Sequence, residues 1–156
     1  MDEYKKGTEL ASKCQGNGCR FDEILLTGLV ERITSSNKDK FFVVLHTKGS
    51  HDPSYYAKYP SQFEKFTPVC RSEQLSDCTQ QALINAYDNT ILYTDYFINE
   101  AISRLDKLKN IPSMLVYVSD HGESLGESGL YLTAHPIHLR RNIKKRFRFL
   151  FGALMQ

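Results

Sequence analysis

Apolar and polar positions change their spacing several times along the chain, and these changes predict four secondary-structure elements. Apolar residues recur at helical spacing over 21–33 and again over 79–109. Two short uninterrupted apolar runs, FFVVLH at 41–46 and MLVYVS at 114–119, are typical of strands covered on both faces. The order helix, strand, helix, strand predicts an α/β fold with a mainly parallel sheet flanked by helices.

Polar and ionisable residues follow both predicted strands. The first strand leads into His46 and His51, and the second leads into Asp120, His121 and Glu123. In open α/β sheets, ligands bind at the carboxyl ends of the strands. We therefore expect these side chains to contribute to one site at that edge of the sheet.

Asp120 and His121 are candidate metal ligands. A carboxylate beside an imidazole is a donor pair typical of zinc sites, and Gly122 allows the backbone to turn sharply after the pair. Glu123 is a further ligand, a partner of a ligand, or a group that recognises a cationic substrate. The alternative is that Asp120 caps a following helix and His121 is an ordinary polar residue.

His51, in the stretch TKGSHDP, is a candidate for binding phosphate or transferring a proton. The alternative is a loop histidine with no chemical role. Three hydroxyl residues near the strand ends are candidate nucleophiles: Thr47, Ser119 and Ser124. None of them lies in a G-x-S-x-G elbow, which argues against a serine hydrolase.

The four cysteines form two closely spaced pairs. Cys14 and Cys19 enclose one polar loop, and Cys70 and Cys78 enclose another, which favours two disulfides and an oxidising compartment. Zinc binding by all four is the alternative, but these spacings differ from those of zinc ribbons. No signal peptide or membrane span is visible, so the chain as written is expected to stay in the cytosol. The oxidising compartment that the disulfides favour conflicts with the cytosol that the missing signal peptide favours.

The charge is unevenly distributed. Residues 133–156 contain six Lys and Arg and no Asp or Glu, whereas residues 1–132 contain 14 basic and 18 acidic residues, a net charge of −4. The chain is therefore a mildly acidic domain with a basic tail, and such a tail suits anionic lipid or RNA.

Three stretches resemble one enzyme family in order and in spacing: LHTKGSHDPSYYAKYPSQFEKFTPVC, LINAYDNTILYTDYFI and LVYVSDHGESLGESGLYL. They are similar to the catalytic domain of lipid A phosphoethanolamine transferases, which include the mobile colistin-resistance enzymes of the alkaline phosphatase and sulfatase superfamily. The resemblance covers residues 1–132 nearly continuously. It implies a partial sulfatase-like sandwich, incomplete at both ends.

The family resemblance also implies a mechanism. A zinc-bound Thr takes phosphoethanolamine from phosphatidylethanolamine, and the group then passes to a phosphate of lipid A. Asp120 and His121 would be two zinc ligands, His51 would lie at the phosphoryl or second-metal site, and Glu123 would border it. The cysteine pairs match the disulfide loops of the family. A membrane anchor precedes the periplasmic catalytic domain in that family, which would resolve the conflict over compartment.

Three departures set this chain apart from the family. No residue matches the nucleophilic Thr or a Glu that also binds zinc, so the chain alone is expected to be inactive. Asp52 replaces the Gly of the family motif GSHGP, and Thr133 stands where the family motif YLHG.P has a further active-site His. A shifted reading frame after Leu132 would restore family-like text, so residues 133–156 are interpreted as a frame artefact.

Two other functions remain open at this point. One is a sulfatase or phosphodiesterase of the same superfamily, against which the continuation SLGESGLYL argues. The other is a small binding protein that uses RRNIKKRFRF on anionic lipid or RNA, with binding that salt weakens. For the transferase reading, no nucleic-acid partner is expected.

Overall fold

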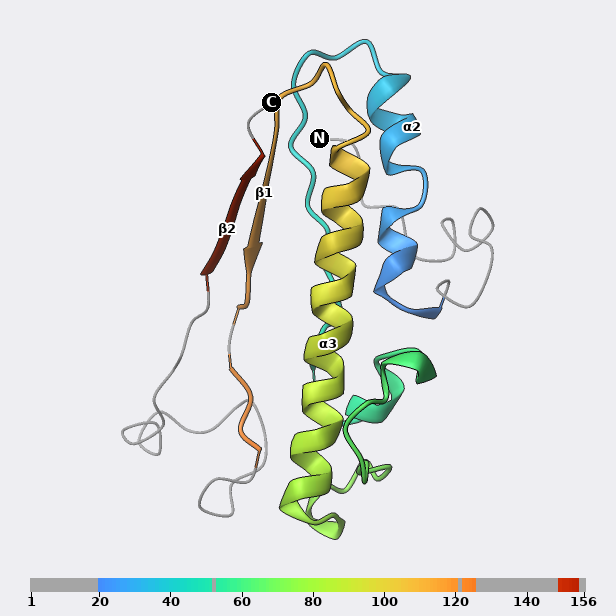
Figure 1. Ribbon diagram of the computed structural model, residues 1–156, viewed down its shortest axis with the longest axis vertical. Coiled ribbons are helices and arrows are strands. Elements are labelled where there is room, and N and C mark those ends of the chain that lie inside the picture. Colours follow the sequence, from blue (N-terminus) through green and yellow to red (C-terminus); the bar gives the residue numbers. More distant parts are fainter. Residues whose placement is uncertain (1–19, 52, 121, 126–148, 155–156) are drawn as a thin grey trace.

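The computed structural model describes residues 20–51, 53–120, 122–125 and 149–154 (Figure 1). Its longest element, helix α3 (Gln80–Leu105), runs along the length of the molecule, and the other elements pack beside it. These are the 3-10 turns η2 (Asp22–Leu26), η3 (Tyr55–Ala57), η4 (Ser61–Phe63) and η5 (Leu75–Asp77), helix α2 (Leu29–Thr34), and strands β1 (Ser113–Val118) and β2 (Phe149–Leu154).

Helix α3 confirms the helix predicted over 79–109. Thr79 caps its start, where the side-chain oxygen accepts a hydrogen bond from the Ala82 amide at 3.2 Å. The residues that the helix buries recur at three- and four-residue intervals, which is the spacing on which the prediction rested: Ala82, Leu83, Asn85, Ala86, Asn89, Thr90, Tyr93, Phe97 and Ala101.

The helix predicted over 21–33 is divided in two. Gly28 lies between η2 and α2 with a φ of +69°, in the left-handed region that glycine adopts at little cost. Because no helix continues through such a residue, the apolar spacing is shared by two short pieces. Leu26 of the first and Ile33 of the second are buried.

Strand β1 confirms the strand predicted at 114–119, displaced by one residue. It pairs with β2 in antiparallel register, with Val116 opposite Phe151. Within the described residues this two-stranded ladder is the whole sheet, so the mainly parallel sheet that was predicted is not found there. The physical reason is that residues 149–154 return alongside β1 in the opposite direction.

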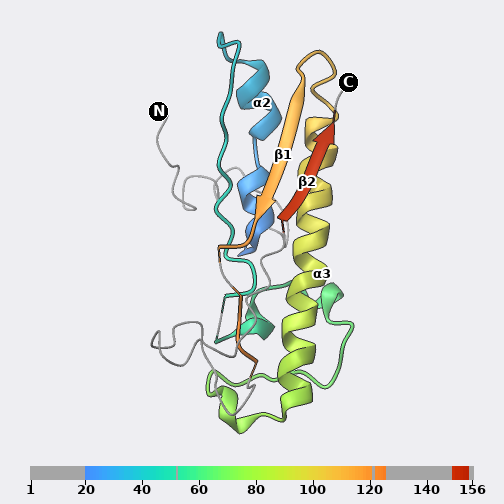
Figure 2. The same ribbon diagram turned by 90° about the vertical axis from the view of Figure 1, so that its left-hand side faces the viewer.

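The strand predicted at 41–46 is wrong as a paired strand, because the structure assigns no ladder to these residues. The segment nevertheless runs beside β1 and in the same direction, on the side opposite β2, in both views (Figures 1 and 2). Leu45 and Leu115 pack against the same buried cluster of Leu26, Phe97 and Ala101. Apolar packing thus places the segment where a parallel neighbour would lie, without the hydrogen bonds of a strand.

Apolar side chains are exposed on one face of β1 and along residues 41–44 of the neighbouring segment. Along β1, half-buried and exposed residues alternate, and Met114, Val116 and Val118 are the exposed ones. Phe42 and Val44 of the neighbouring segment are exposed as well, Phe42 to 92%. Phe41 and Val43 are exposed to 37% and 49%, so the alternation of a half-covered strand holds for β1 and not for this segment.

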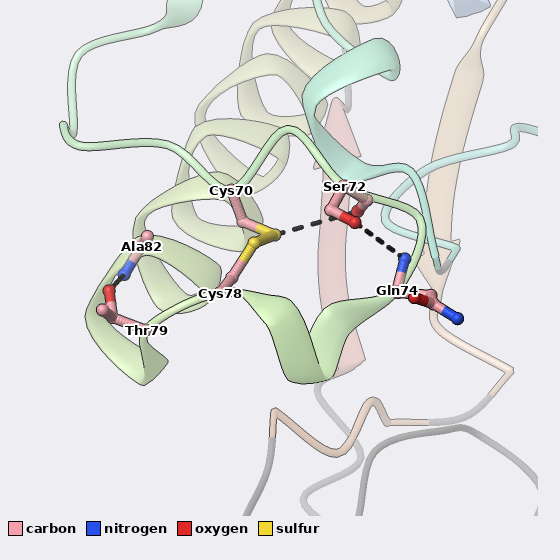
Figure 3. Close-up of a disulfide and its surroundings, with 6 residues drawn as sticks. All are labelled: Cys70, Ser72, Gln74, Cys78, Thr79 and Ala82. Atoms are coloured by element: carbon pink, nitrogen blue, oxygen red, sulfur yellow. Dashed lines mark hydrogen bonds between the residues drawn. A yellow bond between two sulfur atoms is a disulfide. The ribbon is translucent and has the colours of Figure 1, made fainter.

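A disulfide joins Cys70 to Cys78 and closes the loop before α3 (Figure 3). Within this loop the Gln74 amide donates to the Ser72 hydroxyl at 3.0 Å. Cys70 belongs to a buried cluster that also contains Tyr55, Leu75 and Leu83. The predicted pairing of Cys70 with Cys78 is confirmed, while the predicted Cys14–Cys19 pair lies outside the described residues.

Asn89 of α3 holds the segment at 59–68 from inside the molecule. Its side-chain oxygen accepts hydrogen bonds from the amides of Lys65 at 2.8 Å and Phe66 at 2.9 Å. Its side-chain nitrogen donates to the Phe66 carbonyl at 2.9 Å and to the Tyr59 hydroxyl at 3.3 Å. The residue is 0% exposed, so these partners replace water completely.

Candidate active site at the end of strand β1

The loop at 47–51 carries His51 and begins where the segment at 41–46 ends. Its chain turns at Gly49, which has a φ of +51°. The His51 amide donates to the Lys48 carbonyl at 3.3 Å, which closes the turn. His51 itself is exposed.

Asp22, at the start of η2, binds this loop with both carboxylate oxygens. Oδ1 accepts a hydrogen bond from the Lys48 amide at 2.9 Å, and Oδ2 accepts one from the Gly49 amide at 3.0 Å. Both donors are backbone groups 26 and 27 residues away in the sequence. A single carboxylate therefore fixes the position of the turn relative to η2.

Hydrogen bonds between Glu23 and Tyr93 anchor η2 to α3. The Glu23 amide donates to the Tyr93 hydroxyl at 3.2 Å, and that hydroxyl lies 3.3 Å from Glu23 Oε2, to which it donates. Tyr93 is 2% exposed, and its ring packs edge-on against Phe21 and Phe63. Burial raises the pKa of the Tyr93 phenol, and the charge of the Glu23 carboxylate raises it further.

Helix α3 also holds the loop directly. The Thr90 hydroxyl and the Ser50 hydroxyl share a hydrogen bond with an oxygen–oxygen distance of 2.5 Å. Thr90 is 1% exposed, so this contact is made inside the protein. The loop at 47–51 is thus held by η2 at Lys48 and Gly49 and by α3 at Ser50.

Strand β1, which carries Tyr117, and the segment at 41–46 run side by side in the same direction, so the residues that follow each of them lie at the same end of this layer (Figures 1 and 2). Burial raises the pKa of the Tyr117 phenol, and the nearby carboxylates of Asp120 and Asp22 raise it further. That the two strand ends contribute to one site stays a prediction.

The predicted site residues follow β1 and the segment at 41–46. Asp120 is exposed directly after β1, Glu123 is half-buried three residues further on, and His51 is exposed on the loop. His121 lies outside the described residues. Within the ranges that the structure describes, no three His, Cys, Asp or Glu side chains form a cluster that could hold a metal ion. The donor types of Asp120 and its neighbour His121, carboxylate oxygen and imidazole nitrogen, suit zinc.

Sequence reasoning missed the residues whose hydrogen bonds hold the His51 loop: Asp22, Ser50 and Thr90. Thr90 lay within a helical pattern. The signal for Asp22 was an acidic residue in the first turn of a helix, which normally indicates favourable interaction with the helix dipole. Its long-range contact with residues 48 and 49 leaves no local pattern.

Comparison with known proteins identifies the family. A family model described as Sulfatase matches residues 2–146. The chain belongs to the sulfatase family. Phosphoethanolamine transferase EptA of Escherichia coli strain K12 is 44% identical to it over 142 residues, which cover 90% of the chain and 26% of the relative. Phosphatidylethanolamine transferase Mcr-1 of Escherichia coli is 42% identical over 137 residues, covering 86% of the chain and 25% of the relative.

Solved structures of similar proteins agree with this sulfatase-family assignment. The C-terminal periplasmic domain of phosphoethanolamine transferase EptC from Campylobacter jejuni superposes with a TM-score of 0.79 and 45% identity, covering 89% of this chain and 45% of that one. The integral membrane protein EptA from Neisseria meningitidis superposes with a TM-score of 0.81 and 39% identity, covering 95% and 28%. These likenesses confirm the predicted fold class and the resemblance to phosphoethanolamine transferases.

The chain spans about a quarter of the length of the curated relatives that it matches. It corresponds to part of the soluble domain in the solved structures. Among the described residues, no helix combines the length and the apolar character that a membrane crossing requires.

Proposed function

We propose that the chain forms part of the catalytic centre of a zinc-dependent phosphoethanolamine transferase. This enzyme would move phosphoethanolamine from phosphatidylethanolamine to lipid A. The observation that carries the proposal is that the segment at 41–46 and β1 run side by side in the same direction, so the His51 loop and Asp120 follow at the same end of this layer (Figures 1 and 2). Sequence identity of 44% to a phosphoethanolamine transferase supports the choice of reaction.

Each predicted residue has a role in this proposal. Asp120 and His121 would hold the zinc ion, which, when bound, would neutralise charge on the phosphoryl oxygens and lower the pKa of a hydroxyl nucleophile. His51 would bind a phosphoryl oxygen or carry a proton for the leaving group. Glu123 would attract the ammonium group of ethanolamine.

None of the 156 residues matches the nucleophilic Thr of the family. The purified chain alone is therefore expected to release no phosphoethanolamine from phosphatidylethanolamine. In an intact enzyme these residues would work on the periplasmic side of the inner membrane, an oxidising compartment that suits the Cys70–Cys78 disulfide.

Residues 133–156 are proposed to be a tail that a shifted reading frame has added to a domain at 1–132. Six residues of this tail form β2 and pair with β1. Resequencing the coding region tests the proposal. A family-like sequence encoded in a shifted reading frame would support it, and an intact, independently confirmed frame would refute it.

A chimeric enzyme tests the proposed activity. The segment of Escherichia coli EptA that matches this chain would be replaced by the corresponding residues of the chain, and the purified chimera would be given phosphatidylethanolamine and lipid A in detergent. We expect transfer to lipid A that a chelator abolishes and added zinc restores. The variant Asp120→Asn should lose at least 100-fold in rate, because it removes a charged zinc ligand.

Two results would count against the proposal. Hydrolysis of the donor without transfer to lipid A would indicate a phosphodiesterase of the same superfamily. Transfer that is unchanged in Asp120→Asn would remove Asp120 from the centre. A matched control is Asp39→Asn, which removes an exposed carboxylate on the loop after α2 and should leave transfer within twofold of the unchanged chimera.

A further inference from the structure

We propose that Asp22 and Thr90 are positioning residues, which hold the loop at 47–51 from two sides and thereby set the position of His51. What His51 does there rests on the proposed function. That the two residues fix the loop rests on the geometry alone. Neither residue would touch the substrate, so neither is a catalytic residue.

The loop has little structure of its own to hold it in place. The segment before it forms no ladder within the described residues, and Lys48 and His51 are exposed. Inside the loop, the bond from the His51 amide to the Lys48 carbonyl is long, at 3.3 Å. Its position therefore depends on contacts with other elements.

Asp22 supplies the first of these contacts. Its two oxygens accept from two successive backbone amides at 2.9 and 3.0 Å, so the carboxylate fixes both the position and the orientation of the turn. Hydrogen bonds to an ionised carboxylate are about twice as strong as neutral ones. The amide of asparagine has the same shape, but it would replace one acceptor by a donor that faces an N–H group.

Thr90 supplies the second contact. Its hydroxyl oxygen lies 2.6 Å from the Tyr87 carbonyl and 2.5 Å from the Ser50 hydroxyl. A hydroxyl has one proton, and a carbonyl can only accept. Thr90 therefore donates to Tyr87 and accepts from Ser50, which connects the loop to the buried side of α3.

These two contacts matter because small displacements of a reacting group are costly. A shift of about 1 Å in a group that orients the substrate can lower a rate about 100-fold. Neither contact is part of the local folding of the loop, because Asp22 is 26 residues before Lys48 and Thr90 is 40 residues after Ser50.

Four variants separate positioning from general stability. Asp22→Asn removes one acceptor at constant shape, and Asp22→Glu keeps a carboxylate with two acceptors. Thr90→Val removes the hydroxyl that meets Ser50. Thr94→Val is the matched control one turn along α3, because among the described residues the Thr94 hydroxyl bonds only to the Thr90 carbonyl of its own helix, at 2.9 Å.

The first readout is amide hydrogen exchange, followed by NMR on the full 156-residue chain. We expect the Lys48 and Gly49 amides to exchange at least tenfold faster in Asp22→Asn, with the Asp22→Glu variant in between. Thr90→Val should accelerate exchange at residues 48–51, and Thr94→Val should change it less than twofold. Unchanged exchange in both Asp22→Asn and Thr90→Val would overturn the inference.

The second readout is steady-state transfer by the chimera described above. Asp22→Asn should lower kcat at least tenfold with KM within threefold, and Asp22→Glu should recover part of that loss. A merely structural role would leave kcat per folded molecule unchanged, and that result would overturn positioning. If the unchanged chimera transfers nothing, the proposed function fails, and the exchange data still decide whether Asp22 and Thr90 hold the loop.

Discussion

Two segments pack against helix α3, and the protein holds them in different ways. The segment at 59–68 is bound by the buried amide of Asn89, which makes four hydrogen bonds to it. The loop at 47–51 is bound by the half-buried carboxylate of Asp22 and by one hydroxyl of α3. In both cases a single side chain binds two backbone amides. Asn89 is fully buried and binds them away from water, whereas Asp22 is half-buried and remains accessible to water.

This difference separates stability from the precision of the site. A fully buried amide leaves several polar groups without partners when it is removed, so its loss destabilises the fold. A half-buried carboxylate can be replaced by water at its donors, so its loss costs less free energy and mainly frees the loop. The segment at 59–68 therefore acts as part of the core, and the loop at 47–51 as part of the site.

The largest effect on stability is expected from Asn89→Ala. It removes four hydrogen bonds and leaves partly buried donors at Lys65 and Phe66 without partners. The free energy of unfolding should fall by about 3 to 5 kcal/mol in urea titrations. The control Asn37→Ala, at an exposed loop position, should stay within about 0.5 kcal/mol of the parent. A loss for Asn89→Ala as small as that of the control would refute the distinction between the two segments.

The next largest effect concerns the covalent bridge beside the same segment. The double variant Cys70→Ala, Cys78→Ala opens a loop with a sequence separation of 8. Chain entropy predicts a loss of about 2.5 kcal/mol, measured by urea unfolding under oxidising conditions. Adding a reductant to the parent chain should reproduce most of this loss. A parent chain that is equally stable with and without reductant would contradict it.

Alkaline pH should weaken the anchor of η2, on which Asp22 lies. Burial, followed by the Glu23 charge, raises the pKa of Tyr93 above the value of 10.0 that it has when unfolded. The folded state then keeps the Tyr93 proton to higher pH than the unfolded state. The stability that Tyr93 contributes is therefore fully present below pH 10 and is lost as the pH rises above 10. The stability that this group supplies should therefore decrease steadily between pH 10 and pH 11.

The pH dependence can be assigned with two variants. Tyr93→Phe should be less stable than the parent at pH 8 and should lose less between pH 9 and pH 11 in urea titrations. Tyr56→Phe, at a half-buried position of η3, should keep the slope of the parent. Equal slopes for the parent and Tyr93→Phe would exclude Tyr93 as the source.

Asp22→Asn should cost less stability than Asn89→Ala or loss of the disulfide and affect the site more. We expect a loss of about 1 to 2 kcal/mol, because two hydrogen bonds to a half-buried carboxylate are disturbed. Transfer by the chimera should nevertheless fall at least tenfold. A variant that loses as much stability as Asn89→Ala would show that both segments belong to the core.

The smallest effect is expected from the ion pair between Arg71 and Glu64. One Arg71 nitrogen lies 2.7 and 2.8 Å from the two Glu64 oxygens, but the Arg71 side chain is 59% exposed. Arg71→Gln should cost about 0.5 kcal/mol at low salt, and the difference should vanish in about 1 M NaCl. A cost above about 2 kcal/mol would mean that this exposed contact supports the segment as strongly as the buried amide does.

The sequence allowed prediction of the elements whose signal is local. Helix α3 has a long apolar period and a Thr cap, and β1 is an apolar run, so both were found within a few residues. The disulfide between Cys70 and Cys78 followed from close spacing around a polar loop. The division of the first helix at Gly28 depended on a backbone conformation that spacing alone does not indicate.

Features that depend on distant partners could not be predicted in the same way. The run at 41–46 has the composition of a strand, but strand pairing requires a neighbour at hydrogen-bonding distance. The antiparallel partner of β1 came from residues 149–154, in a tail that was expected to have no selected structure. Asp22 holds the loop at Lys48 and Gly49, which lie 26 and 27 positions further along the sequence. No periodic pattern marks such a contact.

The mass spectrum of lipid A is the most direct test of the account. Escherichia coli cells without their own phosphoethanolamine transferases would express the EptA chimera that contains this chain's matching segment. The account predicts lipid A that carries added phosphoethanolamine, reduced to background by Asp120→Asn and strongly reduced by Asp22→Asn. Unmodified lipid A from a chimera that is present at normal levels, beside modified lipid A from intact EptA, would contradict it.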